Sequence, residues 1–432
     1  MRKVAGVDSS TQSVKIVVRD AETGQLLASA SRLHPEGTEV DPHAWWIALQ
    51  GVISDIGGLD DIEAISIAGQ QHGMVVLDEN GEVIRPALLW NDTRSAQAAI
   101  DLNNEFPDIH QRVGSKLVAS FTATKLRWLR DHEPANAAKV RAVALPHDWL
   151  SWKLSGSTKL ADLFTDRSDA SGTGYFDCVT NTYSMEIVEA ALGHTNVILP
   201  RIVAPNDFGF DNGKLRIAPG AGDNAGGALG VGAQLGDLVI SLGTSGTAFA
   251  VSATPTHDSS GEVAGFADAT GNYLPLACTL NAAKIFDSTA KMLGLTFDQY
   301  SELALSAEPG AGGLSLIPYF DGERTPNLPE ATGGLNGITH ANFTPANIAR
   351  ASIEGVMSGL AYAANAVTAL GVKRERILLI GGAARNPAVR QITKEIFGQE
   401  ITVPPIGEYV ADGAAKQAAW ALLNTPLPPL WN

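Results

Sequence analysis

A carboxylate set in a glycine-rich segment is the first candidate for chemistry in this sequence. Residues 219–252 place Asp223 among several glycines and then run into a Gly/Thr/Ser turn at residues 243–247. An N-cap aspartate contributes about 1 kcal/mol, while each helical glycine costs about as much, so capping alone does not account for the segment. Glycines permit close backbone approach. An acid beside a turn whose amides and hydroxyls could wrap a phosphate predicts phosphoryl transfer.

A similar turn follows the first strand of the chain. Residues 4–14 and 238–247 both read as strand, hydroxyl-bearing turn and strand, and they align on Thr11 and Thr244. Neither turn is a Walker loop, because no Gly-Lys-Ser/Thr follows the glycines. The repeat predicts a duplicated domain that clamps a ligand, with the boundary near residues 233–236. The alternative is that strand–turn–strand is simply common in α/β proteins.

Two other strand ends carry candidate ligand groups. Asp8 closes the first expected strand, either as a carboxylate that holds Mg²⁺ through water or as an Asx-turn residue, and its position leaves both open. Gly381, Gly382 and Ala383 follow an expected strand and precede a helix that opens at Asn386. That order fits nucleotide binding at a helix N-terminus. Taken alone, however, a simple strand-to-helix turn is the better explanation of these three residues.

Three further segments offer polar side chains at strand or loop ends. His72 follows an expected strand, where α/β sheets bind ligands, although a single histidine is more often a packed residue. Trp90 precedes an Asn-Asp pair and is more often packing than a sugar platform. Residues 166–173 carry hydroxyls and two acids, and a capped, hydrogen-bonded loop explains them as well as a ligand site does.

Size and composition predict a globular chain of more than one domain. The 432 residues exceed one ordinary core, and 45% of them are hydrophobic. With 31 Lys and Arg against 46 Asp and Glu, the net charge of −15 argues against nucleic acid or an anionic membrane as the main partner. Cys178 and Cys278 lack metal-type spacing, which fits a reduced, cytoplasmic location. Neither a signal-peptide core nor an apolar run of membrane-spanning length is found.

The expected elements place the candidate residues at strand ends. A helix should begin at Pro42 with Asp41 as its cap. A hairpin is expected from residues 74–77 and 83–84, and the segment 93–160 should be mainly helical. Strands are expected at residues 4–7, 14–18, 26–33, 62–68, 273–280, 314–320, 376–380 and 401–403. Further helices are expected at residues 184–192, 281–293, 297–305, 345–370, 387–397 and 411–423.

Together these segments resemble the FGGY family of carbohydrate kinases over nearly the whole chain. Three segments look like the sugar-side signatures of the family: residues 69–73, 85–92 and 166–173. Three others look like its catalytic motif, its second phosphate motif and its adenosine motif: residues 222–227, 242–246 and 381–383, respectively. The resemblance implies an α/β fold of two actin-like (ribonuclease H-type) domains with an active-site cleft between them. Residues 1–234 would form the sugar-binding domain with the catalytic base, and residues 235–432 the ATP-binding domain.

The resemblance also implies the reaction and its partners. The expected activity is Mg²⁺-assisted transfer of the γ-phosphate of ATP to a ketose hydroxyl, converting D-xylulose to D-xylulose 5-phosphate. The alternatives are a kinase for another ketose or polyol, such as ribulose or a pentitol, and a non-catalytic actin-like sugar sensor or ATPase. The expected partners are the sugar and ATP, without nucleic acid or membrane, and a homodimer is the assembly considered.

Residue roles follow from the same resemblance. Asp223 would be the general base, and Asp8 the catalytic aspartate near the metal. Gln71 stands where the relatives usually carry Met, which adds an amide to the sugar side. The sugar contacts would come from Gln71, His72, Trp90, Asp223 and Asn224. The ATP contacts would come from Thr11, Gly243, Thr244, Ser245, Gly381, Gly382, Ala383 and Asn386.

Overall fold

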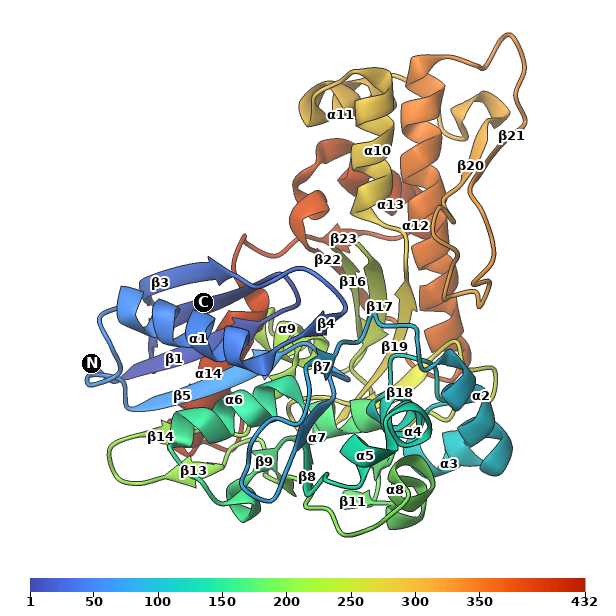
Figure 1. The fold of residues 1–432 in the computed structure, drawn as a ribbon. Coiled ribbons are helices and arrows are strands. Elements are labelled where there is room, and N and C mark those ends of the chain that lie inside the picture. Colours follow the sequence, from blue (N-terminus) through green and yellow to red (C-terminus); the bar gives the residue numbers. More distant parts are fainter. Residues whose placement is uncertain (432) are drawn as a thin grey trace. The chain divides into compact units, whose positions relative to one another are not determined.

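The computed structural model describes residues 1–431, which form two compact units (Figure 1). Unit 1 contains Met1–Ala233, Gly265–Leu274 and the residues from Gly407 onward. Unit 2 contains Gln234–Ala264 and Pro275–Ile406. The chain therefore leaves unit 1 after Ala233 and returns to it twice.

The main sheet of unit 1 is built around the first strand of the chain. β1 pairs antiparallel with β2 and parallel with β5, and β2 continues antiparallel to β3, so the predicted three-strand meander is confirmed. In spatial order the strands are β13 Phe210–Asp211, β14 Arg216–Ile217, β5 Ala64–Gly69, β1 Lys3–Ser9, β2 Ser13–Asp20 and β3 Leu26–Leu33, with β15 Ala221–Gly222 also paired to β5.

Smaller ladders and helices surround that sheet. The short ladders are β4 Glu39–Val40 with β7 Ala87–Leu88, β6 Val75–Leu77 with β8 Ala142–Ala144, β9 Phe164–Thr165 with β12 Arg201–Ile202, and β10 Phe176–Asp177 with β11 Thr182–Tyr183. The helices of unit 1 are α1 Pro42–Asp55, α2 Ala96–Glu105, α3 Ile109–Val113, α4 Thr122–His132, α5 Pro134–Ala137, α6 Pro146–Ser155, α7 Arg167–Ala170, α8 Met185–Leu192, α9 Asp223–Gly230 and α14 Tyr409–Leu423.

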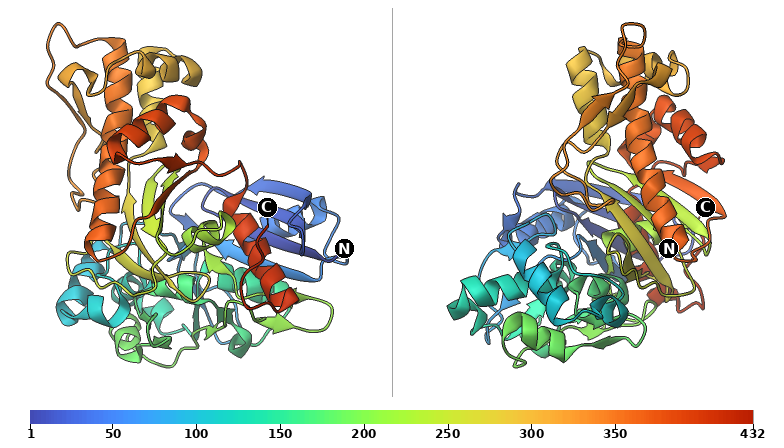
Figure 2. Two further views of the ribbon diagram at one scale, coloured as in Figure 1. Left: turned by 180° about the vertical axis from the view of Figure 1, so that it is seen from behind. Right: turned by 90° about the vertical axis from the view of Figure 1, so that its right-hand side faces the viewer.

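Alternation along β1 decides which side chain meets which helix. Ala5 and Val7 join the core that contains Trp45 of α1, whereas Val4 packs with alanines of α14 on the other face. Because successive strand residues point to opposite faces, Asp8 shares the α14 face with Val4. The views from both sides show α1 and α14 on opposite faces of this sheet (Figures 1 and 2).

Unit 2 repeats the same arrangement of strands. β16 pairs antiparallel with β17 and parallel with β22, as β1 does with β2 and β5. The predicted duplication of the strand–turn–strand segment is thus present in the pairing. Its strands run β19 Tyr273–Thr279, β17 Gly246–Ala250, β16 Asp237–Leu242, β22 Arg376–Ile380 and β23 Ile401–Thr402, with a separate ladder of β20 Ser315–Ile317 and β21 Gly334–Asn336. Most of β18 Ala264–Ala267 and the first two residues of β19 belong to unit 1. The helices of unit 2 are α10 Ala283–Leu293, α11 Phe297–Leu305, α12 Pro345–Ala369 and α13 Pro387–Phe397.

Two segments of unit 1 differ in part from the expectation. The hairpin expected from residues 74–77 and 83–84 is present as a bridge between Leu77 and Val83, with bonds from the Asp78 amide to the Glu82 carbonyl and from the Ile84 amide to the Val76 carbonyl, both at 3.0 Å. On its other edge β6 pairs with β8, a strand inside the segment expected to be mainly helical. Residues 166–173, expected to be a loop, contain the short helix α7 with Asp166 as its N-cap. The side chain of Asp166 accepts hydrogen bonds from the backbone amides of Ser168 and Asp169 and so stabilises the start of this helix.

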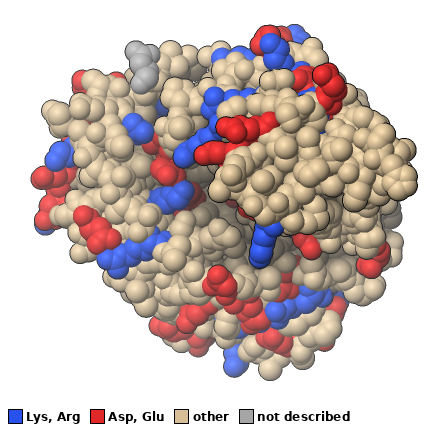
Figure 3. Space-filling view, turned by 90° about the horizontal axis from the view of Figure 1, so that it is seen from above, with Lys and Arg blue, Asp and Glu red and all other residues tan. Residues whose placement is uncertain are grey.

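The last residues of the described chain are anchored rather than loose. Trp431 donates its indole N–H to the Ala21 carbonyl at 3.2 Å, and its ring lies against Gly24 in the β2–β3 turn. The described helices include none long and apolar enough to cross a membrane. On the face of the molecule in Figure 3, acidic and basic side chains are interspersed.

Candidate active site

Asp223 opens helix α9, and its carboxylate is held by its neighbour. Oδ1 accepts hydrogen bonds from the Asn224 amide at 2.7 Å and from Asn224 Nδ2 at 2.8 Å. Loss of hydration raises the pKa of Asp223 to about 6, and the bonds from Asn224 limit that rise. The N-cap of the helix is Gly222, so the capping role considered for Asp223 was wrong. The structure therefore leaves this carboxylate available for chemistry near neutral pH.

Asp8 is the second carboxylate of this region. It lies near the end of β1 and is buried, with no hydrogen-bond partner for Oδ1 among the described residues. Burial raises the pKa of Asp8 to about 7, and the negative charge of Asp223 adds to the rise, while Lys15 opposes it. The two carboxylates are thus electrostatically coupled, while the roles expected for them stay predictions. A buried, unpartnered carboxylate beside a second one suits a cation.

Glycines fix α9 and β1 against the last helix of the chain. A Cβ at Gly230 would lie 1.9 Å from the carbonyl oxygen of Tyr409, and one at Gly6 would lie 2.0 Å from that of Ala411. Both contacts are with the backbone of α14, which cannot move aside like a side chain. The glycines after Asp223 were expected to permit close backbone approach. At Gly230 that approach is between two helices, α9 and α14.

Thr11 and Trp90, predicted for ATP and sugar respectively, are hydrogen-bonded to each other. The Trp90 indole N–H donates to Thr11 Oγ1 at 2.9 Å, and that hydroxyl donates to Gln70 Oε1 at 3.3 Å. The hydroxyl is thus committed to protein groups. The backbone amides of this turn stay as candidates for phosphate binding, apart from that of Ser10, which donates to the Ser13 carbonyl at 3.0 Å. The Trp90 side chain is half-buried, so part of its ring packs against the protein and part stays accessible.

Gln71 and His72 lie after β5 and are both buried. Gln71 Nε2 donates to the carbonyl of Ser168 at 3.1 Å, and its side chain lies against Gly222, where a Cβ would be 2.7 Å from Nε2. The amide that distinguishes Gln71 from Met is therefore bound to the protein. His72 Nδ1 lies 2.6 Å from the carbonyl of Gly172, which fixes the ring.

The backbone at His72 has a conformation that needs support. Its φ of 68° is in the left-handed region, which is rare for a residue with a side chain. The carbonyl of His72 accepts hydrogen bonds from Thr122 Oγ1 at 3.1 Å and from Lys125 Nζ at 3.0 Å. Lys125 is fully buried, and burial lowers its pKa to about 7. Lys125 was not predicted from the sequence, although a lysine among apolar helix positions was a usable signal.

The predicted ATP residues of unit 2 meet at one sheet edge. Gly243, Thr244 and Ser245 form the turn that joins β16 to β17, and Gly243 and Thr244 are exposed. The carbonyls of Gly243 and Thr244 accept bonds from the first amides of the α10 region, at 3.0 and 3.3 Å. This leaves the outer side of the turn open to a ligand.

Gly381 brings the second motif against that turn. β22 runs parallel to β16, with Ile380 opposite Ser241, so both strands end at the same edge. Gly381 has a φ of 96°, and a Cβ there would lie 2.3 Å from the Leu242 carbonyl oxygen. Exposed Gly382 follows directly, whereas Ala383 is buried. Two segments about 140 residues apart in sequence thus form one surface, at the carboxyl ends of parallel strands, where α/β sheets bind ligands.

Asn386 stands where the next helix was expected to open, and it has a structural role there. Its side chain caps α13, accepting from the amides of Ala388 at 2.9 Å and Val389 at 3.2 Å. Ser301 also donates to the same oxygen at 2.8 Å. The predicted opening of the helix at this position is confirmed. Any contact of Asn386 with ATP would have to use another part of the residue.

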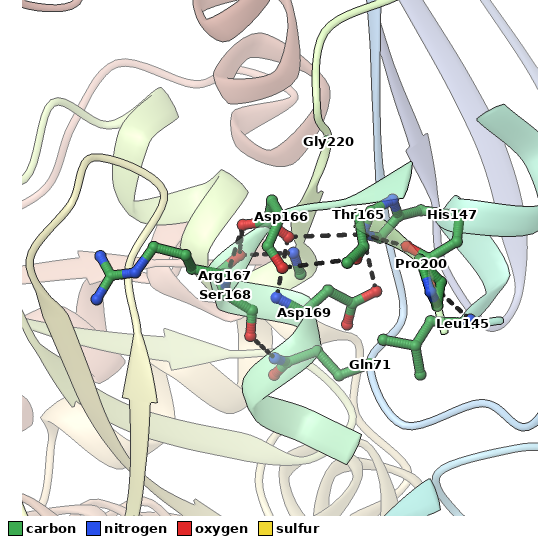
Figure 4. Close-up of polar contacts among 12 residues, drawn as sticks. Gln71, Leu145, His147, Thr165, Asp166, Arg167, Ser168, Asp169, Pro200 and Gly220 are labelled. Atoms are coloured by element: carbon green, nitrogen blue, oxygen red, sulfur yellow. Dashed lines mark hydrogen bonds and ion pairs between the residues drawn. The ribbon is translucent and has the colours of Figure 1, made fainter. Parts of the chain in front are cut away.

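A buried histidine with three carboxylates was also missed. His147 Nε2 lies 3.0 Å from Asp169, 3.4 Å from Asp148 and 3.6 Å from Asp166 (Figure 4). Although burial opposes its charge, Asp148 and Asp169 raise the pKa of His147 well above the usual value. Asp169 was noted as a sugar-side acid, but here it faces the histidine. The pattern His-Asp at a helix start gave no local signal of this cluster.

The repeated sheet and these two sets of residues define a class before any comparison is made. Each unit has a central strand that leads through a turn into an antiparallel neighbour, with a parallel strand on its other side. One unit carries a pair of acids and the other a nucleotide-type edge. This is the organisation of an actin-like phosphotransferase of duplicated α/β type.

Family models and known proteins agree with this class. The model of the FGGY family of carbohydrate kinases, N-terminal domain, matches residues 4–225, and that of its C-terminal domain matches residues 238–422. The xylulose kinases of Streptomyces coelicolor and Streptomyces rubiginosus are each 43% identical, over 97% of this chain and 88% of theirs. The crystal structure of xylulose kinase from Bifidobacterium adolescentis is 45% identical, with a TM-score of 0.91 over 100% of this chain and 95% of that one.

The chain therefore belongs to the FGGY family of carbohydrate kinases. It is an enzyme that phosphorylates a sugar with ATP, as the family requires. The resemblance predicted from the motifs is confirmed, as is the two-domain α/β fold.

Proposed function

We propose that this enzyme transfers the γ-phosphate of ATP to D-xylulose and yields D-xylulose 5-phosphate. The observation that carries the proposal is the 43% identity to two xylulose kinases over nearly the full length of the chain. The acids and the Gln71–His72 segment of unit 1 support it, because they gather at one end of β1 and β5. Unit 1 would supply the sugar contacts, and unit 2 would supply the ATP contacts.

Asp223 is the proposed general base. With Oδ1 held by Asn224, Oδ2 is the oxygen that takes the proton of the sugar hydroxyl. The hydroxyl oxygen forms a bond to the γ-phosphorus, and the bond from that phosphorus to the bridging oxygen breaks, so that ADP leaves with the electron pair. Positioning and charge stabilisation supply the remainder of the catalysis, as in other phosphoryl transfers.

Asp8 is the proposed anchor for Mg²⁺. Its buried, unpartnered Oδ1 and its closeness to the charge of Asp223 fit a site that accepts a divalent cation. The cation would neutralise charge on the phosphates. Asp8 would hold it through water, since Mg²⁺ keeps several waters and takes few protein ligands. The amides of the Thr11 turn and of Gly243–Ser245 are the proposed phosphate contacts.

The residues after β5 are proposed to orient the sugar. His72 is fixed by Gly172, Thr122 and Lys125, so its ring can hold one pose without further ordering when the sugar binds. The side-chain amide of Gln71 donates to the Ser168 carbonyl, so Gln71 would contact the sugar through its backbone or the other atoms of its side chain. This geometry supports treating Gln71 as a substitute for Met without a change of substrate class.

A coupled assay of ADP release tests the proposal. D-xylulose, D-ribulose, L-ribulose and glycerol are offered at equal concentration with ATP and Mg²⁺, and a reaction without sugar is run beside them. We expect the highest kcat/KM with D-xylulose. A higher value with ribulose or glycerol would move the substrate to that sugar. Release of ADP without any sugar would identify an ATPase, and tight sugar binding without release would identify a sensor.

Three further expectations stay predictions: the need for Mg²⁺, a homodimer and a cytoplasmic location. Replacing Mg²⁺ by EDTA in the same assay should abolish ADP release, and restoring Mg²⁺ should recover it. A homodimer and a cytoplasmic location are compatible with the chain, and sedimentation and cell fractionation measure them.

A further inference from the structure

Ser168 occupies a position that links three parts of unit 1. It is fully buried at the start of α7, and its backbone amide and hydroxyl both donate to Asp166 Oδ2, at 2.7 and 2.6 Å. Its hydroxyl oxygen also accepts the backbone N–H of Gly222 at 3.0 Å. Its carbonyl accepts the Gln71 amide, as the close-up shows (Figure 4). No residue of this group is among the proposed contacts with ATP.

Gly222 is the residue immediately before Asp223. It ends the short strand β15, which pairs with β5, and it is the N-cap of α9 without a side chain to cap the helix. The bond from its amide to Ser168 is therefore the side-chain contact that holds the strand-to-helix turn. Because Asp223 is the first helical residue, its carboxylate follows any rotation of that turn.

Asp166 is in turn held in place. Besides Ser168, it accepts the backbone amide of Asp169 at 3.0 Å as the N-cap of α7. The imidazole of His147 lies 3.6 Å from its Oδ1 and is itself fully buried. A buried acceptor with several donors and a basic neighbour is a rigid anchor, since every alternative arrangement would leave a polar group unpaired.

We propose that Ser168 is a positioning residue for the general base. Its hydroxyl joins Asp166 to the Gly222 amide and so sets the direction of the Asp223 carboxylate, while its carbonyl holds Gln71 on the sugar side. The inference rests on the proposed role of Asp223. It adds a residue that touches neither sugar nor ATP but couples the turn carrying the base to the segment that binds the sugar.

The substitution Ser168→Ala separates these two functions. It removes the hydroxyl and orphans the Gly222 amide, but it keeps the backbone carbonyl that holds Gln71. We expect kcat with D-xylulose to fall by about 10- to 100-fold, because a small misplacement of a catalytic group has effects of that size. The dissociation constant for D-xylulose, measured by calorimetry without nucleotide, should change by less than about threefold, because the contact with Gln71 remains.

Ser352→Ala is the matched control, because Ser352 is equally buried and its hydroxyl bonds to Tyr300 and Ala349 within unit 2. It should lower the thermal midpoint without lowering kcat. Unchanged kcat in Ser168→Ala, an equal loss of kcat in the control, or a rise in the dissociation constant as large as the fall in kcat would each overturn the proposal. If Ser168→Ala does not fold, Ser168→Cys keeps the volume with a weaker hydrogen bond and is judged by the same criteria.

The result is also distinguishable from a failure of the proposed function. If Asp223→Asn turns over D-xylulose normally, Asp223 is not the base and the proposed mechanism fails first. If Asp223→Asn is inactive while Ser168→Ala retains its kcat, the base stands and only the positioning role is refuted.

Discussion

Asp223→Asn is the most informative substitution in this enzyme. It replaces one carboxylate oxygen by an amide nitrogen and still allows the hydrogen bonds that the other oxygen accepts. The asparagine Oδ1 can still accept from both donors of Asn224, so the start of α9 should keep its geometry. What is lost is the ability to take a proton. A general base contributes about 10²- to 10⁴-fold, which is about 2.7–5.5 kcal/mol of the barrier. We expect kcat to fall by that factor while the sugar still binds.

The pH dependence follows from the environment of Asp223. Its pKa of about 6 lies above the ordinary value because burial disfavours the charged form. At pH 7 the reactive carboxylate therefore predominates by about tenfold, and at pH 5 the protonated form predominates by about tenfold. Since the base acts when deprotonated, kcat/KM should rise by about tenfold per pH unit up to pH 6 and then level off.

The assay is ADP release with D-xylulose between pH 4.5 and 8.5, with excess coupling enzymes. Asp8 titrates close to Asp223, so the acid limb of the wild-type profile belongs to the pair until the variant is measured. Asp223→Asn should remove the contribution of Asp223 to that limb, along with most of the activity, and leave a limb that belongs to Asp8 alone. Asp258→Asn makes the same chemical change at a buried loop carboxylate of unit 2 and should leave the profile intact.

Two results would refute the reasoning. One is a kcat of Asp223→Asn within about threefold of the wild-type value, since the lower bound for a general base is about 10²-fold. The other is an identical acid limb in the variant, which would place the titrating group elsewhere. A lowered thermal midpoint alone would decide nothing about catalysis, so each variant is measured below its own transition.

Three further predictions concern the supporting structure. Measured without divalent cation at pH 8, Asp8→Asn should raise the free energy of unfolding by about 4 kcal/mol, because the raised pKa of Asp8 means that its ionised form is disfavoured in the native state. This gain should vanish near pH 3.8, where the carboxyl group is protonated in the native state, and a gain that does not change with pH would contradict the prediction. Gly230→Ala should lower the thermal midpoint sharply because of the 1.9 Å contact, whereas Gly359→Ala, a helical glycine with nothing within 4 Å, should raise it. Lys125→Met should raise the KM for sugar more than it lowers kcat, through loss of support for His72, and an unchanged KM would exclude that role.

Local sequence signals predicted the elements with strong punctuation. Proline at the first helical position and a capping residue before it located α1 after Asp41 and α13 after Asn386. A run of β-branched and aliphatic residues located β22 at Arg376–Ile380. These signals depend on only a few neighbouring residues, so they can be recognised without knowledge of the fold. Pairing between distant strands does depend on the fold, which is why the ladder of β6 with β8, inside the segment expected to be mainly helical, was not predicted.

The sequence pointed to two acids of the candidate site but not to the residues that hold the neighbouring segments. Asp8 and Asp223 were selected because each is a carboxylate at or beside a turn that could bind a phosphate. Lys125 and Ser168 contact residues about 50 positions away, which only the fold brings together, and the lysine among apolar helix positions was the one local signal. The hydroxyl of Thr11 was assigned to ATP, but its bond with Trp90 is formed by a residue 79 positions further on. Long-range hydrogen bonds were thus the main information that the sequence did not provide.

The glycines around Asp223 show why the two acids can stay close. The charge of Asp223 contributes to the raised pKa of Asp8, so the two carboxylates repel each other when both are ionised. Repulsion of this kind would move flexible supports apart. Here β1 and α9 are instead packed against one helix, α14, at contacts where Gly6 and Gly230 let backbone meet backbone. Contacts between backbones can shift less than contacts between side chains. Helix α14, near the end of the chain, therefore fixes the distance between Asp8, near the beginning of the chain, and Asp223, near its middle.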